Sequence, residues 1–463
     1  MQCQILLKEC RFLGGNDMDH NLYRLTGKTD IREVLPFSIQ QVLAMFVTNM
    51  VPIFLICSAA KPEMEVEEIL SLVQSAMLAA GIATFIQATP IWKLGSGLPI
   101  IMGASFTFVV PLSAIAAKHG YGAVTGCVLA GGILEGLLGI SVRYWRKMLV
   151  PIVSALVVTG IGLSLLTTAA DSFGGGNAED FGSFENLGIG TVTLITCIAW
   201  NVFVKGSKKH LSILVGGAAG YLFAILLGKV DFSEITQGNI FALPRVLPYA
   251  PVFRLDAIIS VSIIYLVSAT ETLGDAAAVA GGALNRELTM EEAGGALTID
   301  GFGSVISGLL GGTPVTSYSE NVGLTIMTRV VNRNVCRAAG VMLMLAGFFP
   351  PIGRFFNTIP SSVIGGVLLV VLGQILVSGM EMIAAAGFTP RNKLITAISL
   401  SVAIGCTAST EIGLWENFPV AIQSVFAQNV VAVIFVIAIV LNLVLPRKMD
   451  DETPKADNGP VKP

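Results

Sequence analysis

The sequence predicts an all-α polytopic membrane protein. Of its 463 residues, 53% are hydrophobic and only 13% are charged, whereas soluble domains carry about 25% charged residues. Apolar runs that are long enough for a spanning helix, which needs about 20 residues, recur along the whole chain. This composition excludes a soluble fold of the same size.

The apolar runs divide the chain into fourteen candidate spans, of which the third, tenth and eleventh are irregular. Fourteen spans split into seven plus seven, and an odd number in each half inverts the second half relative to the first, as in many transporters. The spans cover approximately residues 37–59, 68–88, 98–117, 123–141, 148–169, 187–204, 211–229, 256–280, 296–313, 318–330, 338–352, 359–379, 392–409 and 426–445.

The positive charges predict that both termini are cytoplasmic. In that orientation the termini and the loops on their side hold 22 of the 28 Lys and Arg residues, as expected when basic loops are retained in the cytoplasm. We therefore expect cytoplasmic tails at residues 1–35 and 447–463 and a transporter domain at 36–446, located in the plasma (inner) membrane.

Two of the irregular spans are expected to contain short strands. Gly103-Ala-Ser-Phe-Thr-Phe in the third span is similar to Val315-Thr-Ser-Tyr-Ser-Glu in the tenth, its equivalent in the second half. Pro99, Pro111 and Pro314 interrupt the helical pattern of these spans. Broken backbone at membrane depth is tolerated only where it lines a cavity. The breaks therefore predict a binding site at half-helix N-termini, which carry a partial positive charge.

Few ionisable side chains lie within the apolar runs, and each is a candidate functional group because its burial costs at least about 2.5 kcal/mol. Glu271 and Asp275 are four residues apart and share one helical face. Glu320 and Asn321 lie at the break of the tenth span. A hydrogen-bonded structural acid and a helix cap are the alternatives, but we interpret these residues as substrate-binding or proton-carrying groups.

Such side chains suit a planar heterocycle that has alternating donors and acceptors. A glutamate accepts N–H bonds from a pyrimidine or purine edge, an asparagine offers a donor and an acceptor, and backbone N–H groups bind ring carbonyls. The rings of Phe106 and Tyr318 are candidates for stacking on the base. We therefore predict a nucleobase pocket at the two broken spans.

Other polar and small residues have weaker interpretations. Glu135 is either a structural hydrogen-bonding group or a secondary protonation site, and Asp300 either caps the ninth span or takes part in transport. Gly131-Gly and Gly216-Gly-Ala-Ala-Gly are interpreted as helix-packing surfaces. The seven cysteines lack disulfide or metal-ligand spacing, and no nucleophile motif is present. We therefore predict no metal, no cofactor and no enzyme activity.

The stretch Glu320-Asn-Val-Gly-Leu-Thr-Ile-Met-Thr-Arg329 resembles the signature of the nucleobase/ascorbate transporter family (nucleobase:cation symporter 2), which reads Gln/Glu/Pro-Asn-x-Gly-x-x-x-x-Thr-Arg/Lys/Gly. The resemblance extends from about Leu35 to Pro446 and includes Glu271-Thr-Leu-Gly-Asp275, Ala44-Met-Phe, Gly103-x-Ser-Phe and Asp300-Gly-Phe-Gly.

The resemblance implies a seven-plus-seven inverted repeat that forms two domains. The core would contain segments 1–4 and 8–11 (about 36–142 and 255–352), and the gate segments 5–7 and 12–14 (about 147–230 and 358–446). Members commonly form homodimers and move the core against the gate. The implied partners are a nucleobase, a proton and the lipid bilayer, and no nucleic acid.

The resemblance also implies roles for single residues. Glu271 and Glu320 would hydrogen-bond the base, and the Phe106 main-chain N–H would contact it. Thr107 and Thr48 would line the site and Asn321 would order the signature region. Our substrate-binding candidates are thus Glu271, Glu320, Phe106, Thr107, Thr48, Asn321 and Tyr318, and our proton-coupling candidates are Asp275, Glu271 and Asp300.

Two departures bear on the substrate. Gln41 replaces a histidine that is frequent in bacterial relatives, which removes support for a coupling role there. Glu320 opens the signature as in uracil permeases, whereas Thr-Leu-Gly-Asp after Glu271 is similar to the purine carriers. We expect a proton symporter for an oxopurine (xanthine or urate), with uracil as the alternative. An anion transporter of the same fold ranks lower because two glutamates would repel an anion.

Overall fold

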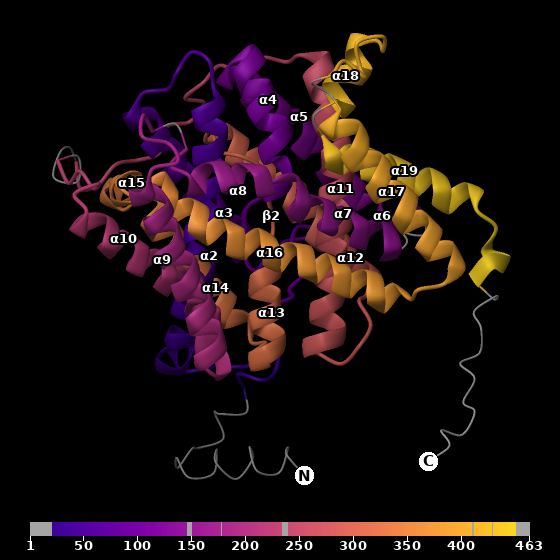
Figure 1. Ribbon diagram of the computed structural model, residues 1–463. Coiled ribbons are helices and arrows are strands. Elements are labelled where there is room, and N and C mark those ends of the chain that lie inside the picture. Colours follow the sequence, from indigo (N-terminus) through magenta and orange to yellow (C-terminus); the bar gives the residue numbers. More distant parts are fainter. Residues whose placement is uncertain are drawn as a thin grey trace, which may run out of the picture.

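The computed structural model is built almost entirely of helices (Figure 1). It describes residues 21–145, 151–176, 178–233, 239–409, 412–427 and 429–450. Most of the predicted N-terminal tail, the start of the predicted fifth span and residues 451–463 of the predicted C-terminal tail lie outside these residues. The first long helix begins at Ile31 and so includes the last five residues of the predicted N-terminal tail, because the Asp30 side chain caps it by accepting from the Arg32 N–H.

Most of the helices follow one another with short connections, but a long segment separates α10 from α11. They are α2 (Ile31–Ala59), α3 (Val66–Ala88), α4 (Val109–His119), α5 (Tyr121–Ile140), α6 (Val142–Trp145), α7 (Pro151–Ser164), α8 (Leu166–Phe173), α9 (Phe184–Phe203), α10 (Ser212–Leu226), α11 (Leu255–Ala278), α12 (Met290–Leu309), α13 (Ser319–Thr328), α14 (Arg333–Ala346), α15 (Pro350–Asn357), α16 (Ser361–Ala386), α17 (Pro390–Ala408), α18 (Val420–Phe426) and α19 (Val430–Val444).

Seven helical segments in the described parts of the chain are long and apolar enough to cross a membrane. An eighth is added if α14 and α15, which meet at 79°, form one broken span. Each of the fourteen predicted spans overlaps a helix, and several of these helices, such as α4, α10 and α19, are shorter than a full span. A polytopic helical protein is therefore confirmed, while the count of fourteen and the inverted repeat remain predictions.

The two predicted strands are confirmed. β1 (Met102–Ala104) and β2 (Val315–Ser317) pair antiparallel, with Gly103 opposite Thr316. The short helix η2 (Phe106–Phe108) and α4 follow β1, and α13 follows β2. Each broken segment is thus a strand that runs into a helix.

Two hydrogen bonds continue the pairing beyond the strands. The Ser105 N–H donates to Pro314 O and the Tyr318 N–H donates to Ile101 O, both at 3.0 Å. These bonds hold the end of each strand where its half-helix begins.

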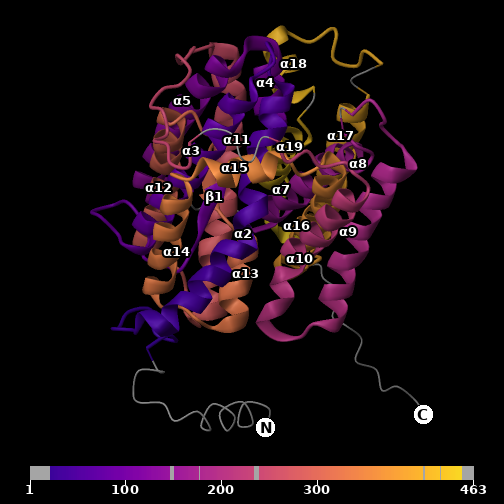
Figure 2. The same cartoon turned by 90° about the vertical axis from the view of Figure 1, so that its left-hand side faces the viewer.

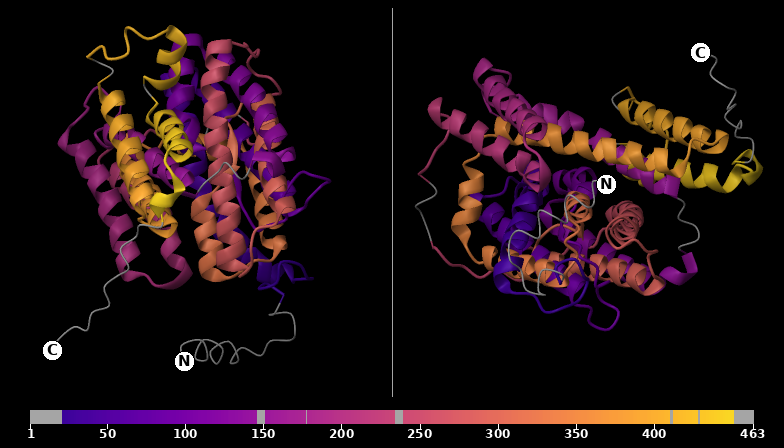
Figure 3. Two further views of the ribbon diagram at one scale, coloured as in Figure 1. Left: turned by 90° about the vertical axis from the view of Figure 1, so that its right-hand side faces the viewer. Right: turned by 90° about the horizontal axis from the view of Figure 1, so that it is seen from below.

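The helices are arranged in two layers. Viewed from below, α9, α10, α16, α17 and α19 form an elongated layer, and a bundle that includes α2, α3, α5 and α11–α14 lies beside it (Figure 3). The side view separates the same two groups, with β1 inside the bundle (Figure 2). The strand breaks therefore lie in the bundle near its boundary with the other layer.

Glycines bring neighbouring helices into backbone contact, as predicted for the small-residue surfaces. A Cβ atom at Gly131 would overlap the Tyr265 ring of α11, and one at Gly301 of α12 would overlap the Gly136 backbone of α5. In the other layer, a Cβ at Gly216 or Gly220 would overlap α9. These close approaches fix the helices that carry the buried carboxyl groups.

Candidate functional site

A small cavity lies between the strand breaks and the second layer of helices. Its volume is about 40 Å³, far below the roughly 300–1,000 Å³ of ligand pockets, so the cavity in this structure is too small to hold a base. The lining residues are Ala104, Ser105, Phe106, Glu271, Thr316, Ser317, Tyr318, Ser319 and Glu320 from the bundle, and Val158, Ile161, Ile375 and Ser378 from α7 and α16. A larger hollow of about 690 Å³ beside α3 and α15 contains no part of the strand breaks.

Both half-helices begin at this cavity. Phe106 is the first residue of η2 and Ser319 is the first residue of α13, and both line the cavity. The first turn of a helix leaves N–H groups without helical partners, and the helix dipole adds a partial positive charge there. The two helix N-termini can therefore donate hydrogen bonds to oxygen atoms of a ligand.

Glu271 and Glu320 line the same cavity from different elements, α11 and α13. The hydroxyl of Thr107 in η2 donates to Glu271 Oε2 at 2.9 Å. No Lys, Arg or His is among the lining residues that the structure describes. The site therefore offers carboxyl acceptors without a cationic partner.

Asp275 lies one helical turn beyond Glu271 on α11 and is buried. It accepts hydrogen bonds from the hydroxyls of Ser317 at 2.6 Å and Ser319 at 2.9 Å. It is not among the residues that line the cavity. Asp275 is thus connected to the ligand side through β2 and the first residue of α13.

Asp300 is fully buried on α12. Its Oδ2 accepts from the hydroxyl of Thr272 and, at 3.3 Å, from that of Thr316. Since Asp300 is the eleventh residue of α12, it does not cap that helix, and the structure contradicts the capping interpretation. Thr289 caps α12 instead, through a capping box with Glu292.

Asn321 and Gln41 form a contact away from the cavity lining. The Asn321 amide donates to the Gln41 carbonyl oxygen at 2.9 Å and to Gln41 Oε1 at 2.7 Å. The Gln41 amide in turn donates to Thr325 Oγ1 at 3.1 Å. These bonds attach α13 to α2, and a direct contact of Asn321 with substrate remains a prediction.

Tyr318 supports the strands, whereas Thr48 forms its hydrogen bond within its own helix α2. The Tyr318 hydroxyl donates to Ala104 O at 2.8 Å, and the Thr48 hydroxyl donates to Met45 O at 3.0 Å. Tyr318 lines the cavity and Thr48 does not. The Tyr318 side chain is almost wholly buried, so its ring is held in place from one side by β1.

The sequence analysis did not identify the residues contributed by the second layer. Val158 and Ile161 lie on α7, and Ile375 and Ser378 lie on α16. These side chains are typical of any apolar span, so nothing in their local pattern distinguishes them. Ser317 and Ser319 were also missed, although they lie within the broken segment that was predicted to line the site.

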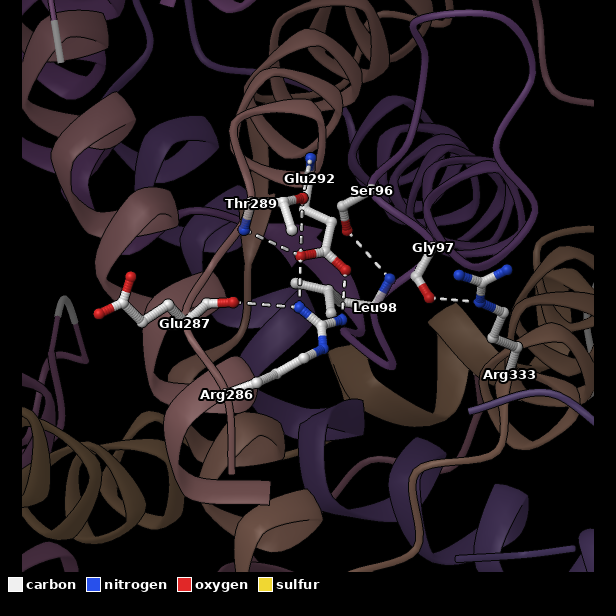
Figure 4. A network of polar contacts seen from close by, with 8 residues as sticks. All are labelled: Ser96, Gly97, Leu98, Arg286, Glu287, Thr289, Glu292 and Arg333. Carbon is white, nitrogen blue, oxygen red and sulfur yellow. Dashed lines mark hydrogen bonds and ion pairs between the residues drawn. The ribbon is translucent and has the colours of Figure 1, made fainter. Parts of the chain in front are cut away.

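An ionic network fixes the ends of the elements that lead to the strands (Figure 4). The Arg286 guanidinium makes two hydrogen bonds to the Glu292 carboxylate, at 2.8 and 2.5 Å. Glu292 also accepts from the Thr289 N–H at the start of α12. Arg333 Nε donates to Gly97 O at 2.5 Å, so the segment before β1 is held against α14.

Comparison with known proteins agrees with this architecture. A family model described as a permease family matches residues 32–412. The uric acid permease PucJ of Bacillus subtilis (strain 168) is 32% identical over 401 residues, which cover 84% of this chain and 88% of PucJ. The xanthine permease XanQ of Escherichia coli (strain K12) is 32% identical over 448 residues, which cover 93% of this chain and 94% of XanQ.

The fold is also similar to that of a solved structure, the transmembrane domain of the cyanobacterial bicarbonate transporter BicA. That structure aligns with a TM-score of 0.56 and 17% identity, covering 90% of this chain and 99% of the BicA domain. The shared fold, together with the family match over most of the chain, identifies a membrane permease. The chain belongs to the nucleobase/ascorbate transporter family.

Proposed function

We propose that this permease is a proton-coupled symporter that imports an oxopurine such as xanthine or urate. The observation that carries the proposal is the position of Glu271 and Glu320 on one cavity between two half-helix N-termini, without a basic residue among the described lining. The similarity to permeases named for uric acid and xanthine supports a purine rather than a pyrimidine.

The base would be held at its edge by carboxyl groups and helix ends. Glu271, oriented by Thr107, and Glu320 would accept N–H groups of the purine, since ionised carboxylates are acceptors only. The N–H groups at the starts of η2 and α13 would bind the ring carbonyls. Val158, Ile161 and Ile375 would cover the apolar face of the ring.

Proton coupling would follow from the cost of charge in a closed site. A carboxylate taken out of water without a partner is strongly disfavoured, so a proton that neutralises one of these acids would favour closure around the base. Asp275, Glu271 and Asp300 are the candidate carriers. Asp275 is the most suitable, because Ser317 and Ser319 connect it to the cavity without exposing it to the ligand.

The cavity in this structure is too small for a base. Transport would therefore require the two layers to move relative to each other so that the cavity opens. The bundle of α2–α5 and α11–α14 would act as the core and the layer of α7–α10 and α16–α19 as the gate. We propose that each layer combines segments of both seven-segment inverted repeats, with segments 1–4 and 8–11 in the core and 5–7 and 12–14 in the gate. Both termini would lie in the cytoplasm, and a homodimer would be the functional unit.

Uracil is the second candidate substrate, because Glu320 opens the signature as it does in uracil permeases. An anion is disfavoured despite the similarity in fold to a bicarbonate transporter. An anion would need a cationic side chain or free N–H groups as partners, without carboxylates nearby. The cavity instead contains two carboxyl groups, which would repel an anion. Substrate competition therefore separates the three possibilities.

The proposal is tested by uptake of radiolabelled xanthine in bacterial cells that lack their own purine permeases. We expect uptake above the empty-vector control, competition by unlabelled urate but not by bicarbonate, and a large loss of uptake after a protonophore is added. Stronger competition by uracil than by urate would transfer the assignment to uracil. Xanthine uptake that is unaffected by the protonophore would reject proton symport.

A further inference from the structure

Glu135 of α5 and Asp300 of α12 face each other inside the bundle, behind the cavity. Both residues are fully buried. A Cβ atom at Gly301, the neighbour of Asp300, would lie 2.7 Å from the backbone carbonyl carbon of Glu135, and the two carboxyl groups interact across this contact. Both carboxyl oxygens of Glu135 and Oδ1 of Asp300 lack a hydrogen-bond donor in the parts of the chain that the structure describes. Two ionised carboxylates are acceptors only, so this contact needs a proton between them.

The close packing of α5 on α12 brings the two carboxyl groups together. A Cβ atom at Gly301, next to Asp300, would overlap the backbone of Gly136, next to Glu135. A Cβ atom at Gly132 would approach Gly301 O to 2.7 Å. Since the helices touch through their backbones, the two carboxyl groups are brought together, and separating them would require this close packing to be given up.

The surroundings of the pair contain further acids and hydroxyls. From α11, Tyr265 and Glu271 are the titratable groups that interact with it, and the Ser268 hydroxyl on the same helix interacts with Glu135. The Tyr265 hydroxyl donates to Val128 O at 3.1 Å. None of the ion pairs among the described residues includes either carboxyl group. A proton is therefore the available means of reducing the negative charge.

A short series of hydroxyls joins the pair to Asp275. Thr272 donates to Asp300 Oδ2. Ser317 Oγ lies 3.5 Å from Thr272 Oγ1 and donates to Asp275 Oδ2 at 2.6 Å. Each neighbouring pair along this route is within reach of a hydrogen bond.

We propose that Glu135 and Asp300 share one proton and form a second proton-binding site, which exchanges its proton with Asp275 through Thr272 and Ser317. In the transfer Asp300 gives a proton to the Thr272 hydroxyl, Thr272 gives its own to Ser317, and Ser317 gives its own to Asp275. One carboxyl group loses a proton, another gains one, and the two hydroxyls are reoriented. The role in transport rests on the proton symport proposed above, whereas the shared proton does not.

Infrared spectroscopy of the purified protein tests the shared proton directly. In Glu135→Gln the side-chain amide donates a hydrogen bond to Asp300, so no shared proton is needed. The side chain keeps its shape and its contact with Asp300. We expect a protonated-carboxyl C=O band in the wild type at neutral pH that is lost in Glu135→Gln and kept in Glu381→Gln, which alters an exposed carboxyl group. An unchanged band in Glu135→Gln would overturn the proposal. If that variant does not fold, Asp300→Asn removes the other half of the pair and must lose the same band.

The transport role is tested by the pH dependence of uptake. Glu135 does not line the cavity, so Glu135→Gln is expected to keep the KM for the base. The pH of half-maximal uptake should shift by about one unit or more, the size expected when an interacting protonation site is removed. Glu135→Asp, which retains a carboxyl group, should restore much of the wild-type profile. If the folded Glu135→Gln variant shows the same pH dependence of uptake as the wild type, the contact between Glu135 and Asp300 is structural and has no role in transport. If the wild type carries no xanthine, the infrared result still decides whether the proton is shared.

Discussion

The hydroxyl of Thr107 donates a 2.9 Å hydrogen bond to Oε2 of Glu271. The bond connects the turn after β1 with the middle of α11, two elements that are far apart in the sequence. Thr107 is buried and is not among the residues lining the cavity, whereas Glu271 is. Thr107 therefore orients the carboxyl group that we assign to base binding.

Replacing Thr107 by valine should weaken base binding while keeping the shape of the side chain. A hydrogen bond to a charged group contributes about 1.5–3 kcal/mol, so the KM for uptake should rise roughly tenfold or more. Thr107→Ser keeps the donor and should stay close to the wild type. Equal KM values for Thr107→Val and the wild type would show that the bond does not orient Glu271 for binding.

Glu320→Gln should change which bases compete without impairing folding. The amide presents an N–H donor where the carboxylate presents an acceptor, so a purine N–H loses its partner and a ring carbonyl gains one. Competition of unlabelled bases against labelled substrate measures the change. An inhibition series identical to that of the wild type would place Glu320 outside the recognition contacts.

Gly301→Ala should destabilise the bundle. The new Cβ would overlap the backbone of Gly136 on α5, and overpacking typically costs about 1–3 kcal/mol. The matched control is Gly373→Ala on α16, where an added Cβ meets no atom within 4 Å. Thermal unfolding of the purified variants should show a lower Tm for the first only. Equal Tm values would contradict the close contact of α5 and α12.

The ion pair between Lys229 and Asp180 should stabilise the connection between α8 and α9 in a pH-dependent way. Lys229 Nζ lies 2.7 Å from Asp180 Oδ2. A hydrogen bond from Lys229 holds the pKa of Asp180 below its ordinary value, and the same bond raises the pKa of Lys229.

The contribution of this ion pair to the free energy of unfolding is therefore present at neutral pH. It is lost as the pH falls through the lowered pKa of Asp180 or rises through the raised pKa of Lys229. Because both side chains are about one third exposed, the effect should be small. Lys229→Gln should lower the Tm slightly at pH 7, and the difference should disappear in acid. A difference that persists well below the lowered pKa of Asp180, where its carboxyl group is protonated in the folded protein, would assign it to another cause.

The sequence predicted those features of the site that depend on local composition. Hydropathy located the spans, prolines and small residues located the strands, and the cost of buried charge singled out Glu271, Asp275 and Glu320. Asn321 shows the limit of this reasoning. It was linked to the substrate because it lies at the break of the tenth span and offers a donor and an acceptor, but successive helical residues point about 100° apart. Its amide binds Gln41, while Glu320 lines the cavity.

The features that depend on packing between distant segments could not be predicted. The second layer contributes Val158, Ile161, Ile375 and Ser378, whose selection depends on how α7 and α16 lie against the strand breaks. The contact between Glu135 and Asp300 arises in the same way, from glycines that bring α5 and α12 together. Neither arrangement leaves a periodic pattern in the sequence.

The central claim is that Glu271 holds the base through its carboxyl group. It is tested most directly by calorimetric titration of xanthine into purified wild-type protein and into Glu271→Ala, after both have been shown to unfold at similar temperatures. The account predicts saturable binding by the wild type and none by the variant. Equal affinity of the two proteins for xanthine would contradict it.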